Sequence, residues 1–243
     1  MIIYHGSPQI VKHPELGNGK PYNDYGQGFY CTRSLDLAKE WACSTQKDGF
    51  VNKYISNTEG LDLLNLSDGR HHILNWLALL LKNRTFDLSA ALALQAREYI
   101  IQTFMPDMER KDFIIGYRAD DSYFSFAEDY VSGALSLCDL DEAMRLGALG
   151  EQVVLISPKA FKQISFEEYE AASYQEYHIK RISRDNIARQ AYPGCMGEQS
   201  VKQMTSHSKK KDLKMLKGDL FVLDILREEM KNDDPRIQRI LPE

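Results

Sequence analysis

The order in which strand-like and helix-like segments follow one another constrains the fold of this chain more than any other feature. Short runs rich in β-branched and aromatic residues predict strands at 2–5, 28–32, 51–56, 61–66, 113–117 and 153–156. Apolar residues at helical spacing predict helices at 35–42, 72–82, 88–105 and 139–146. Because two helices within about 70–106 stand between strands, the sequence predicts a mixed α+β fold with a helical insertion.

Chain length and a change of composition near residue 190 set the expected domain boundaries. A chain of 243 residues is near the upper size for one hydrophobic core, which favours one elaborated domain with a small appendage. Tyr192-Pro193-Gly194 interrupts the chain, and a polar stretch and five lysines within 209–217 follow it. We therefore expect a domain at 1–190 and a helical C-terminal extension at 191–243.

The C-terminal extension carries apolar residues at helical spacing, which predict one or two amphipathic helices: Leu213, Leu216, Leu220, Leu223 and Met230. Such a face can pack on the parent domain or dock a small partner protein, and packing on the parent is the favoured interpretation. The neighbouring lysines are interpreted as the solvated side of a helix.

Composition and charge exclude several classes of protein. The formal charge of −5 provides no global field that would attract a polyanion. The longest apolar run, Trp76 to Leu81, is too short to span lipid, and the first residues lack the pattern of an export signal. Four scattered cysteines without CxxC spacing are typical of a reducing compartment. We expect a cytoplasmic protein that does not associate with membranes.

The common chemical motifs are absent or incomplete. Asn18-Gly19-Lys20 lacks the spacing of a phosphate loop, and Cys31 replaces the third glycine of a dinucleotide fingerprint that would begin at Gly26. The six histidines do not pair with cysteines at metal-ligand spacing, so no metal site is expected. Asp120-Asp121 is interpreted as a turn or helix cap rather than a catalytic pair.

One combination of residues is unusual. Tyr4-His5-Gly6-Ser7 ends the first predicted strand, and Asp24 to Thr32 precedes a helix that carries Trp41. A histidine beside a glycine offers a ring donor to a sugar hydroxyl, and a backbone without a side chain can approach a carboxamide. Tyr30 and Trp41 are flat surfaces on which an aromatic ring can stack. The combination predicts a planar ligand such as nicotinamide riboside.

In these residues the sequence resembles the ADP-ribosyltransferase superfamily, in the His-Tyr-Glu branch shared by diphtheria toxin and the poly(ADP-ribose) polymerases. The resemblance rests on His5-Gly6, on Gly26-Gln27-Gly28-Phe29-Tyr30 and on Trp41. The chain is most similar to an uncharacterised bacterial family of the same clan, through three further segments: Val51 to Tyr54, Asp112 to Asp121 and Gln152 to Ile156. Together these motifs cover roughly residues 1–170.

The resemblance implies a fold and a reaction. The expected fold has two small antiparallel sheets around a cleft for NAD, which is a co-substrate, with no metal. The expected reaction is mono-ADP-ribosyl transfer to a protein or nucleic acid by a bacterial toxin, effector or defence protein. His5 would hold the ribose, Gly6 the carboxamide, and Tyr30 and Trp41 the nicotinamide. Gly28 and Thr32, in the second motif, would complete the binding site.

The resemblance also implies a carboxylate that offsets the positive charge of an oxocarbenium-like transition state. Glu151 is the candidate, with Gln152 at the matching position of the more similar family, and a shift of one residue in strand register would exchange them. If Gln152 faces the ribose, Asp24 and Asp120 are candidates for a relocated acid. The alternative functions are an NAD glycohydrolase and a weakly catalytic NAD-binding module that pairs with a small antitoxin or regulatory protein.

Overall fold

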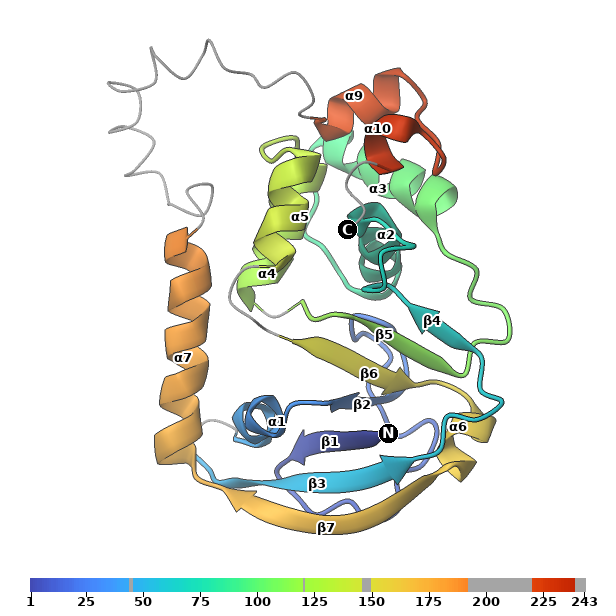
Figure 1. The fold of residues 1–243 in the computed structure, drawn as a ribbon. Coiled ribbons are helices and arrows are strands. Elements are labelled where there is room, and N and C mark those ends of the chain that lie inside the picture. The colour runs from blue at the N-terminus through green and yellow to red at the C-terminus, as the bar shows by residue number, and fades with distance from the viewer. Residues whose placement is uncertain (44–45, 120, 146–149, 192–219, 239–243) are drawn as a thin grey trace.

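The computed structural model describes residues 1–243 except 44–45, 120, 146–149, 192–219 and 239–243 (Figure 1). The strands are β1 (Ile2–Ser7), β2 (Phe29–Thr32), β3 (Gly49–Ser56), β4 (Leu63–Asn65), β5 (Phe113–Tyr117), β6 (Glu151–Leu155) and β7 (Ile164–Ala172). The helices are α1 (Leu35–Ala42), α2 (Ile73–Asn83), α3 (Ala91–Phe104), α4 (Asp121–Val131), α5 (Leu137–Arg145), α6 (Pro158–Lys162), α7 (Tyr174–Ala191), α9 (Val222–Arg227) and α10 (Pro235–Gln238). The expected mixed α+β class is confirmed.

The strands form one sheet in the order β4-β5-β6-β2-β1-β3-β7. The β4 and β5 strands are parallel, and every other neighbouring pair is antiparallel. The expectation of two small separate sheets is therefore wrong for the described part of the chain. The two groups of strands are joined because Tyr4 of β1 pairs with Thr32 of β2.

This contact between β1 and β2, which we call the seam, is short. Its register comprises the single pair of Tyr4 and Thr32, whereas β1 pairs with β3 from Ile2 to Ser7 and β2 pairs with β6 along its whole length. Past that pair, Nδ1 of His5 donates a hydrogen bond to the carbonyl oxygen of Tyr30 at 2.7 Å. The backbone ladder thus consists of two well-paired halves that meet at one residue pair, and a buried cluster that includes Ile3, Phe29 and Tyr54 packs across this junction.

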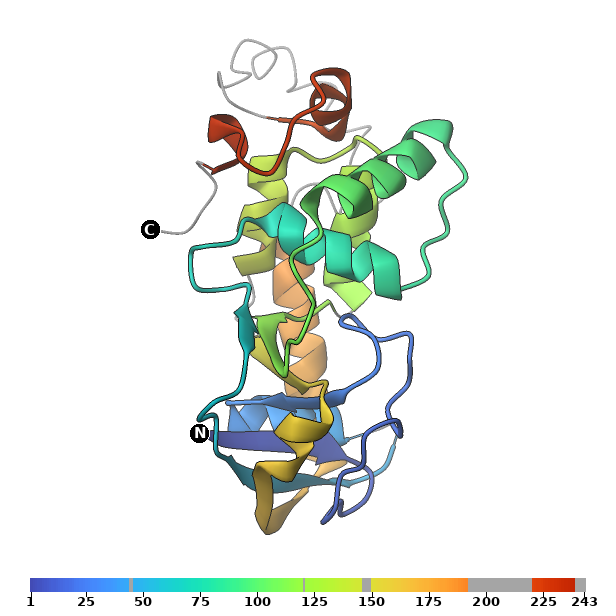
Figure 2. The same ribbon diagram turned by 90° about the vertical axis from the view of Figure 1, so that its right-hand side faces the viewer.

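Helices cover the two halves separately. The helices α2, α3, α4, α5 and α9 gather beside the half made by β4, β5 and β6 (Figures 1 and 2). The sequence of α2 is apolar almost all round, and its residues from Ile73 to Leu81 are buried, as expected for a central helix. Over the other half, α1 and α7 pack through Ala38, Ala42 and Tyr177 against β3 and β7.

The C-terminal segment from Leu220 to Gln238 returns to the helical layer. It contributes a row of buried side chains to the same core as α2 to α5: Leu220, Val222, Ile225, Met230 and Ile237. Asn232 adds a polar link, since its Oδ1 accepts hydrogen bonds from His72 Nε2 at 2.8 Å and from Asn75 Nδ2 at 3.0 Å. Leu213, Leu216 and the lysine run lie outside the described residues.

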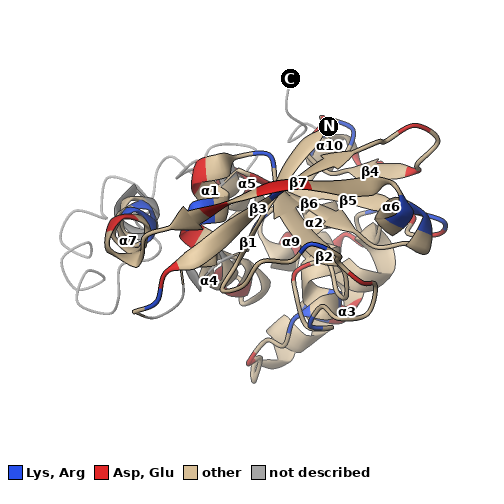
Figure 3. Cartoon of the chain, turned by 90° about the horizontal axis from the view of Figure 1, so that it is seen from below, with Lys and Arg blue, Asp and Glu red and all other residues tan. Residues whose placement is uncertain are grey.

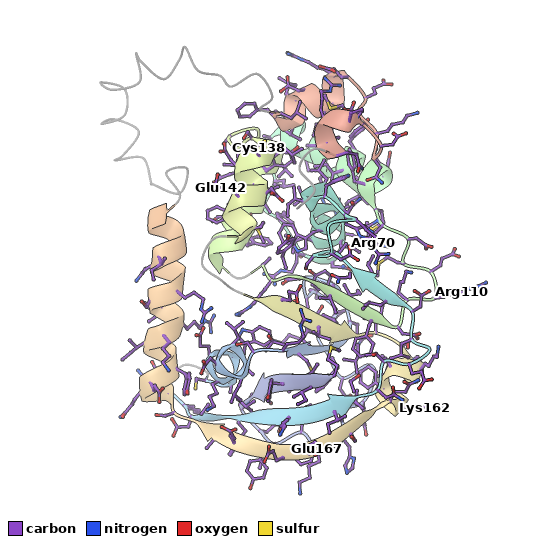
Figure 4. All side chains as sticks on the ribbon, in the orientation of Figure 1. Arg70, Arg110, Cys138, Glu142, Lys162 and Glu167 are labelled. Atoms are coloured by element: carbon purple, nitrogen blue, oxygen red, sulfur yellow. The ribbon has the colours of Figure 1, made fainter. Side chains whose placement is uncertain are left out.

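The surface of the described residues carries charges of both signs. Acidic residues mark the outer strand β7, and lysines mark α6, the short helix that directly precedes this strand (Figure 3). Figure 4 labels one residue of each element, Glu167 on β7 and Lys162 on α6. Within the described ranges, no helix has the length and apolar character needed to cross a lipid bilayer.

Candidate functional site

A cavity of about 480 Å³ opens at the seam, a volume within the range of small-molecule sites. Its walls come from β1, β2, α1 and β6, from the loop between β1 and β2, and from the residues that follow α2 and β5. The lining side chains used below are His5, Asp24, Tyr30, Trp41, Arg84, Arg118 and Gln152. The β1–β2 ladder ends at Tyr4 and Thr32, and among the described residues no strand pairing closes this space.

His5 is held in one orientation by its neighbours. Its Nδ1 bonds the Tyr30 carbonyl oxygen, and its ring lies 4.5 Å from the ring of Phe29 between centroids. A carbonyl can only accept, so Nδ1 carries the proton and Nε2 of the neutral ring is an acceptor. Burial lowers the pKa of His5, and the bond to Tyr30 opposes this effect in part. His5 therefore offers an acceptor to a ligand hydroxyl.

Tyr30 offers the face of its ring rather than its hydroxyl. The hydroxyl donates to the carbonyl oxygen of Gly26 at 2.7 Å and accepts from the backbone N–H of Tyr25 at 3.0 Å. Gly26 has a φ of 76°, which glycine adopts without strain and which turns the loop back toward Tyr30. Both hydrogen-bonding capacities of the hydroxyl are thus used within the fold.

Trp41 reaches the cavity from α1. Ser34 caps this helix, since its side chain accepts a hydrogen bond from the N–H of Leu37. The guanidinium of Arg118 lies 4.8 Å from the centre of the indole ring. The indole Nε1 is buried and has no hydrogen-bond partner among the described residues. Such an atom is unfavourable unless a bound molecule satisfies it.

The alternation of β6 separates Gln152 from Glu151. Gln152 lines the cavity and is 6% exposed. Its Nε2 lies 3.4 Å from Oδ2 of Asp24, and its Oε1 is buried without a partner in the described part of the chain. Glu151 does not line the cavity and forms an ion pair with Arg33 instead. The structure thus places the amide, and not the acid, of this pair in the cavity wall.

Asp24 supplies a buried carboxylate to the same wall. It is 4% exposed, its Oδ2 accepts from the N–H of Ala119 at 2.9 Å, and its Oδ1 accepts from Arg84 Nη1 at 3.2 Å. Burial raises the pKa of Asp24, while the Ala119 hydrogen bond and the charges of Arg84 and Arg118 oppose the rise. Asp120, the other candidate for a relocated acid, lies outside the described residues.

Two of the predicted binding residues act through α1 and do not line the cavity. A side chain at Gly6 would lie 2.0 Å from the carbonyl oxygen of Ala38, so glycine lets α1 pack directly on β1. The hydroxyl of Thr32 accepts from the N–H of Ser34 at 3.2 Å, next to the start of α1. Gly28 does line the cavity, beside Tyr30.

The loop between β1 and β2 forms the outer wall. Asn52 of β3 anchors its first part, since Oδ1 accepts from the N–H of Val11 and Nδ2 donates to the carbonyl oxygens of His5 and Gln9. Gln27 anchors its second part through a hydrogen bond to the carbonyl oxygen of Gly17 at 2.7 Å. The loop is thereby tied to β3 and its two parts are tied to each other.

Sequence reasoning did not single out the two arginines. Arg118 lies within the 112–121 segment that carried the resemblance, which was the available signal. Arg84 follows α2 directly and is 60 residues from Asp24 in the sequence, so only the tertiary fold brings the two together. Among the described residues, no group of three or more His, Cys, Asp or Glu side chains is arranged to hold a metal ion.

Comparison with known proteins identifies a family. The pattern of a family described as "Protein of unknown function (DUF3990)" matches residues 1–166. The chain belongs to this family. All residues that line the DUF3990 cavity, from His5 to Gln152, lie within the matched range. No curated protein and no solved structure matches the chain.

Proposed function

We propose that this DUF3990 protein binds NAD in the cavity at the seam and transfers its ADP-ribose to a macromolecular acceptor. One observation carries the proposal. His5, Tyr30, Trp41 and Gln152, which the sequence resemblance selects from four separate elements, line the same cavity.

The polar atoms of the cavity suit such a ligand. The unpartnered Oε1 of Gln152 needs a donor, and the unpartnered Nε1–H of Trp41 needs an acceptor. A dinucleotide provides both, through its ribose hydroxyls and its carboxamide or phosphate oxygens. The ring faces of Tyr30 and Trp41 can stack on an aromatic base, and guanidinium groups such as those of Arg84 and Arg118 favour phosphate.

NAD supplies an activated glycosidic bond between nicotinamide and ribose. The protein would contribute by holding the ribose and the nicotinamide, the two groups that this bond joins. His5 accepts from a ribose hydroxyl through Nε2, and Trp41 and Tyr30 fix the plane of the base. Asp24 and Gln152 are buried in the wall, which limits competition from water for contacts at that place.

The binding step is tested by titrating the protein with NAD while its tryptophan fluorescence is recorded. The chain has two tryptophans, and Trp76 is 1% exposed and packed in the helical core, so Trp41 is the reporter. We expect a saturable change that disappears in Trp41→Phe and persists in Trp76→Phe. Absence of any saturable change in the wild type would overturn the proposal.

The transfer step is tested with NAD labelled in its ADP-ribose part and whole-cell extract. We expect release of nicotinamide together with label on a macromolecule. Nicotinamide release without a labelled macromolecule would instead assign an NAD glycohydrolase.

A second candidate function is an NAD-binding module without turnover, which could act with a small antitoxin or regulatory protein. The specific observation in its favour is that Gln152, and not Glu151, lies in the cavity wall. Saturable NAD binding without nicotinamide release, in buffer and in extract, would select this candidate over the transferase.

A further inference from the structure

We infer that Asp24 is the carboxylate that stabilises the transition state in this cavity, and that Gln152 positions the ribose beside it. This inference rests on the proposed function. It assigns the role of the catalytic carboxylate to a residue of the loop that precedes β2, in place of Glu151 on β6.

Asp24 is the buried acid of the cavity. The lining residues include two carboxylates, Asp24 and Glu15. Glu15 is exposed in the outer loop and accepts a hydrogen bond from Asn18, whereas Asp24 is 4% exposed. Glu151 is committed to Arg33 outside the cavity. Among the described residues, Asp24 is therefore the acid that a ligand in the interior of the cavity would meet.

Donors face both oxygens of the Asp24 carboxylate. Arg84 faces one carboxylate oxygen, while the N–H of Ala119 and the amide of Gln152 face the other. Burial has the largest effect and raises the pKa of Asp24, and these donors oppose the rise by stabilising the ionised form. A charge held in a water-poor site interacts more strongly with a developing cation than the same charge in water.

Gln152 connects this carboxylate to the ligand. Its Nε2 points to Asp24 at 3.4 Å, which leaves Oε1 as a buried acceptor without a partner in the described part of the chain. A ribose hydroxyl is a donor that would satisfy this oxygen. The sugar would then lie next to the side chain that contacts Asp24, so Gln152 is a positioning residue and Asp24 is a catalytic residue.

The step that Asp24 assists is heterolytic. The bond between C1′ of the ribose and the ring nitrogen of nicotinamide breaks, and its electron pair goes to that nitrogen, so nicotinamide leaves as a neutral molecule. C1′ and the ring oxygen of the sugar share the positive charge, which the carboxylate of Asp24 offsets without accepting a proton. The acceptor then donates an electron pair to C1′ and loses its proton to solvent.

The test compares Asp24→Asn with Glu151→Gln, two substitutions that each exchange a carboxylate for an amide. We expect Asp24→Asn to lower the rate of nicotinamide release about 100-fold or more, with NAD affinity changed by no more than a few fold. Glu151→Gln should stay within about twofold of the wild type in both measurements, because its partner Arg33 is 53% exposed and outside the cavity. Circular dichroism establishes that each variant is folded.

Because Asp24 also contacts Arg84, its substitution removes one partner from a guanidinium whose side chain is 31% exposed, and the stability of Asp24→Asn has to be controlled for. The double variant Asp24→Asn with Arg84→Met removes both charges and should show the same loss of turnover. Gln152→Leu removes the buried acceptor at similar size, and it should raise KM for NAD about tenfold with a smaller effect on kcat. An unchanged KM would overturn the role of Gln152.

The outcomes separate this inference from the proposed function. If Asp24→Asn or the double variant turns over NAD at the wild-type rate while Glu151→Gln loses turnover, the catalytic acid is Glu151. The proposed function would then still hold. A wild-type protein that binds NAD but releases no nicotinamide overturns the catalytic role of Asp24. A wild-type protein that does not bind NAD overturns the proposed function itself.

Discussion

Two of the residues that line the cavity carry a polar atom that is buried without a partner in the described part of the chain, Gln152 Oε1 and Trp41 Nε1. Burying such an atom costs about 1–3 kcal/mol relative to satisfying it, so each is a place where a ligand gains affinity. One is an acceptor and the other a donor. At the scale of single residues, the specificity of the cavity therefore depends on a ligand that presents both kinds of group.

Trp41→Phe should weaken NAD binding about 3- to 10-fold. The phenyl ring keeps a flat surface for stacking but removes the Nε1–H donor, and one hydrogen bond contributes about 0.5–1.5 kcal/mol. Isothermal titration calorimetry gives the affinity. Trp76→Phe is the matched control, since the Nε1 of Trp76 donates to the Tyr117 carbonyl oxygen and Trp76 is not among the lining residues. Equal affinities of Trp41→Phe and the wild type would contradict a donor role for this atom.

His72 should make the fold less stable in acid. Burial lowers the pKa of His72 to about 4, from an ordinary value of 6.5. Its Nε2 donates to Asn232, and its Nδ1 is buried with no partner among the described residues, so a second proton would have no acceptor. Between pH 4 and 6.5 the unfolded state binds more protons at this ring than the folded state, and stability therefore rises with pH.

This contribution is fully present above pH 6.5 and is lost as the pH falls toward 4, up to about 3 kcal/mol at about 1.4 kcal/mol per pKa unit. Urea unfolding at pH 7 and pH 5 measures it. The difference in unfolding free energy between the wild type and His72→Gln should shrink by about 2 kcal/mol at the lower pH. His13→Gln, at an exposed position, should leave the pH dependence unchanged.

At the scale of elements, the sequence predicted those helices and strands in which buried apolar residues recur at regular spacing. The strands at 113–117 and 2–5 and the helix capped by Ser34 appear as β5, β1 and α1 with bounds that agree within two residues. The sequence did not predict β7, which is exposed along most of its length and therefore lacks an apolar alternation. Nor did it predict α7, where Ile179 is 67% exposed.

The candidate site was predictable only where its residues lie on helices and strands that the sequence defines. The short motifs placed His5, Tyr30 and Trp41 at one cavity, because each lies at or near the end of an element that the sequence defines. The choice between Glu151 and Gln152 depends on strand register, which the sequence of one strand leaves open. Arg84 could not be found locally, since its contact with Asp24 is made by the tertiary fold.

The C-terminal segment should be an integral part of the core. Ile225 on α9 is fully buried among the helices, whereas Leu223 on the same helix is 36% exposed. Ile225→Ala should lower the free energy of unfolding by about 2–4 kcal/mol, and Leu223→Ala by less than about 1 kcal/mol. Chemical denaturation monitored by circular dichroism checks both. Equal small effects would mean that α9 contributes little to the stability of the core.

At the scale of the whole molecule, the cavity lies where the two halves of the sheet meet. Few backbone pairs cross this boundary, but a buried cluster that includes Ile3, Phe29 and Tyr54 spans it. The register of the seam is one residue pair, supplemented by the His5 contact to Tyr30. The lining residues come from β1 on one side and from β2 and β6 on the other. A bound molecule would therefore contact both halves, and its binding energy would add to the energy that holds them together.

NAD should protect both halves from hydrogen exchange. We expect slower exchange of backbone amides in β1 and in β2 when NAD is bound, because opening of the seam would break the contacts of the ligand. Mass spectrometry of peptides from 1–8 and 28–34 measures this effect, and peptides of β4, at the far edge of the sheet, serve as the reference. Protection confined to one side of the seam would contradict a ligand that bridges it.

The shortness of the seam also bears on how such a protein could be switched off. A force that pulls β7 away from β4 would meet the fewest backbone pairs at Tyr4 and Thr32. It would also have to break the packing of Ile3 and Tyr54 against Phe29. An inhibitor that loosened this packing would deform the cavity without entering it.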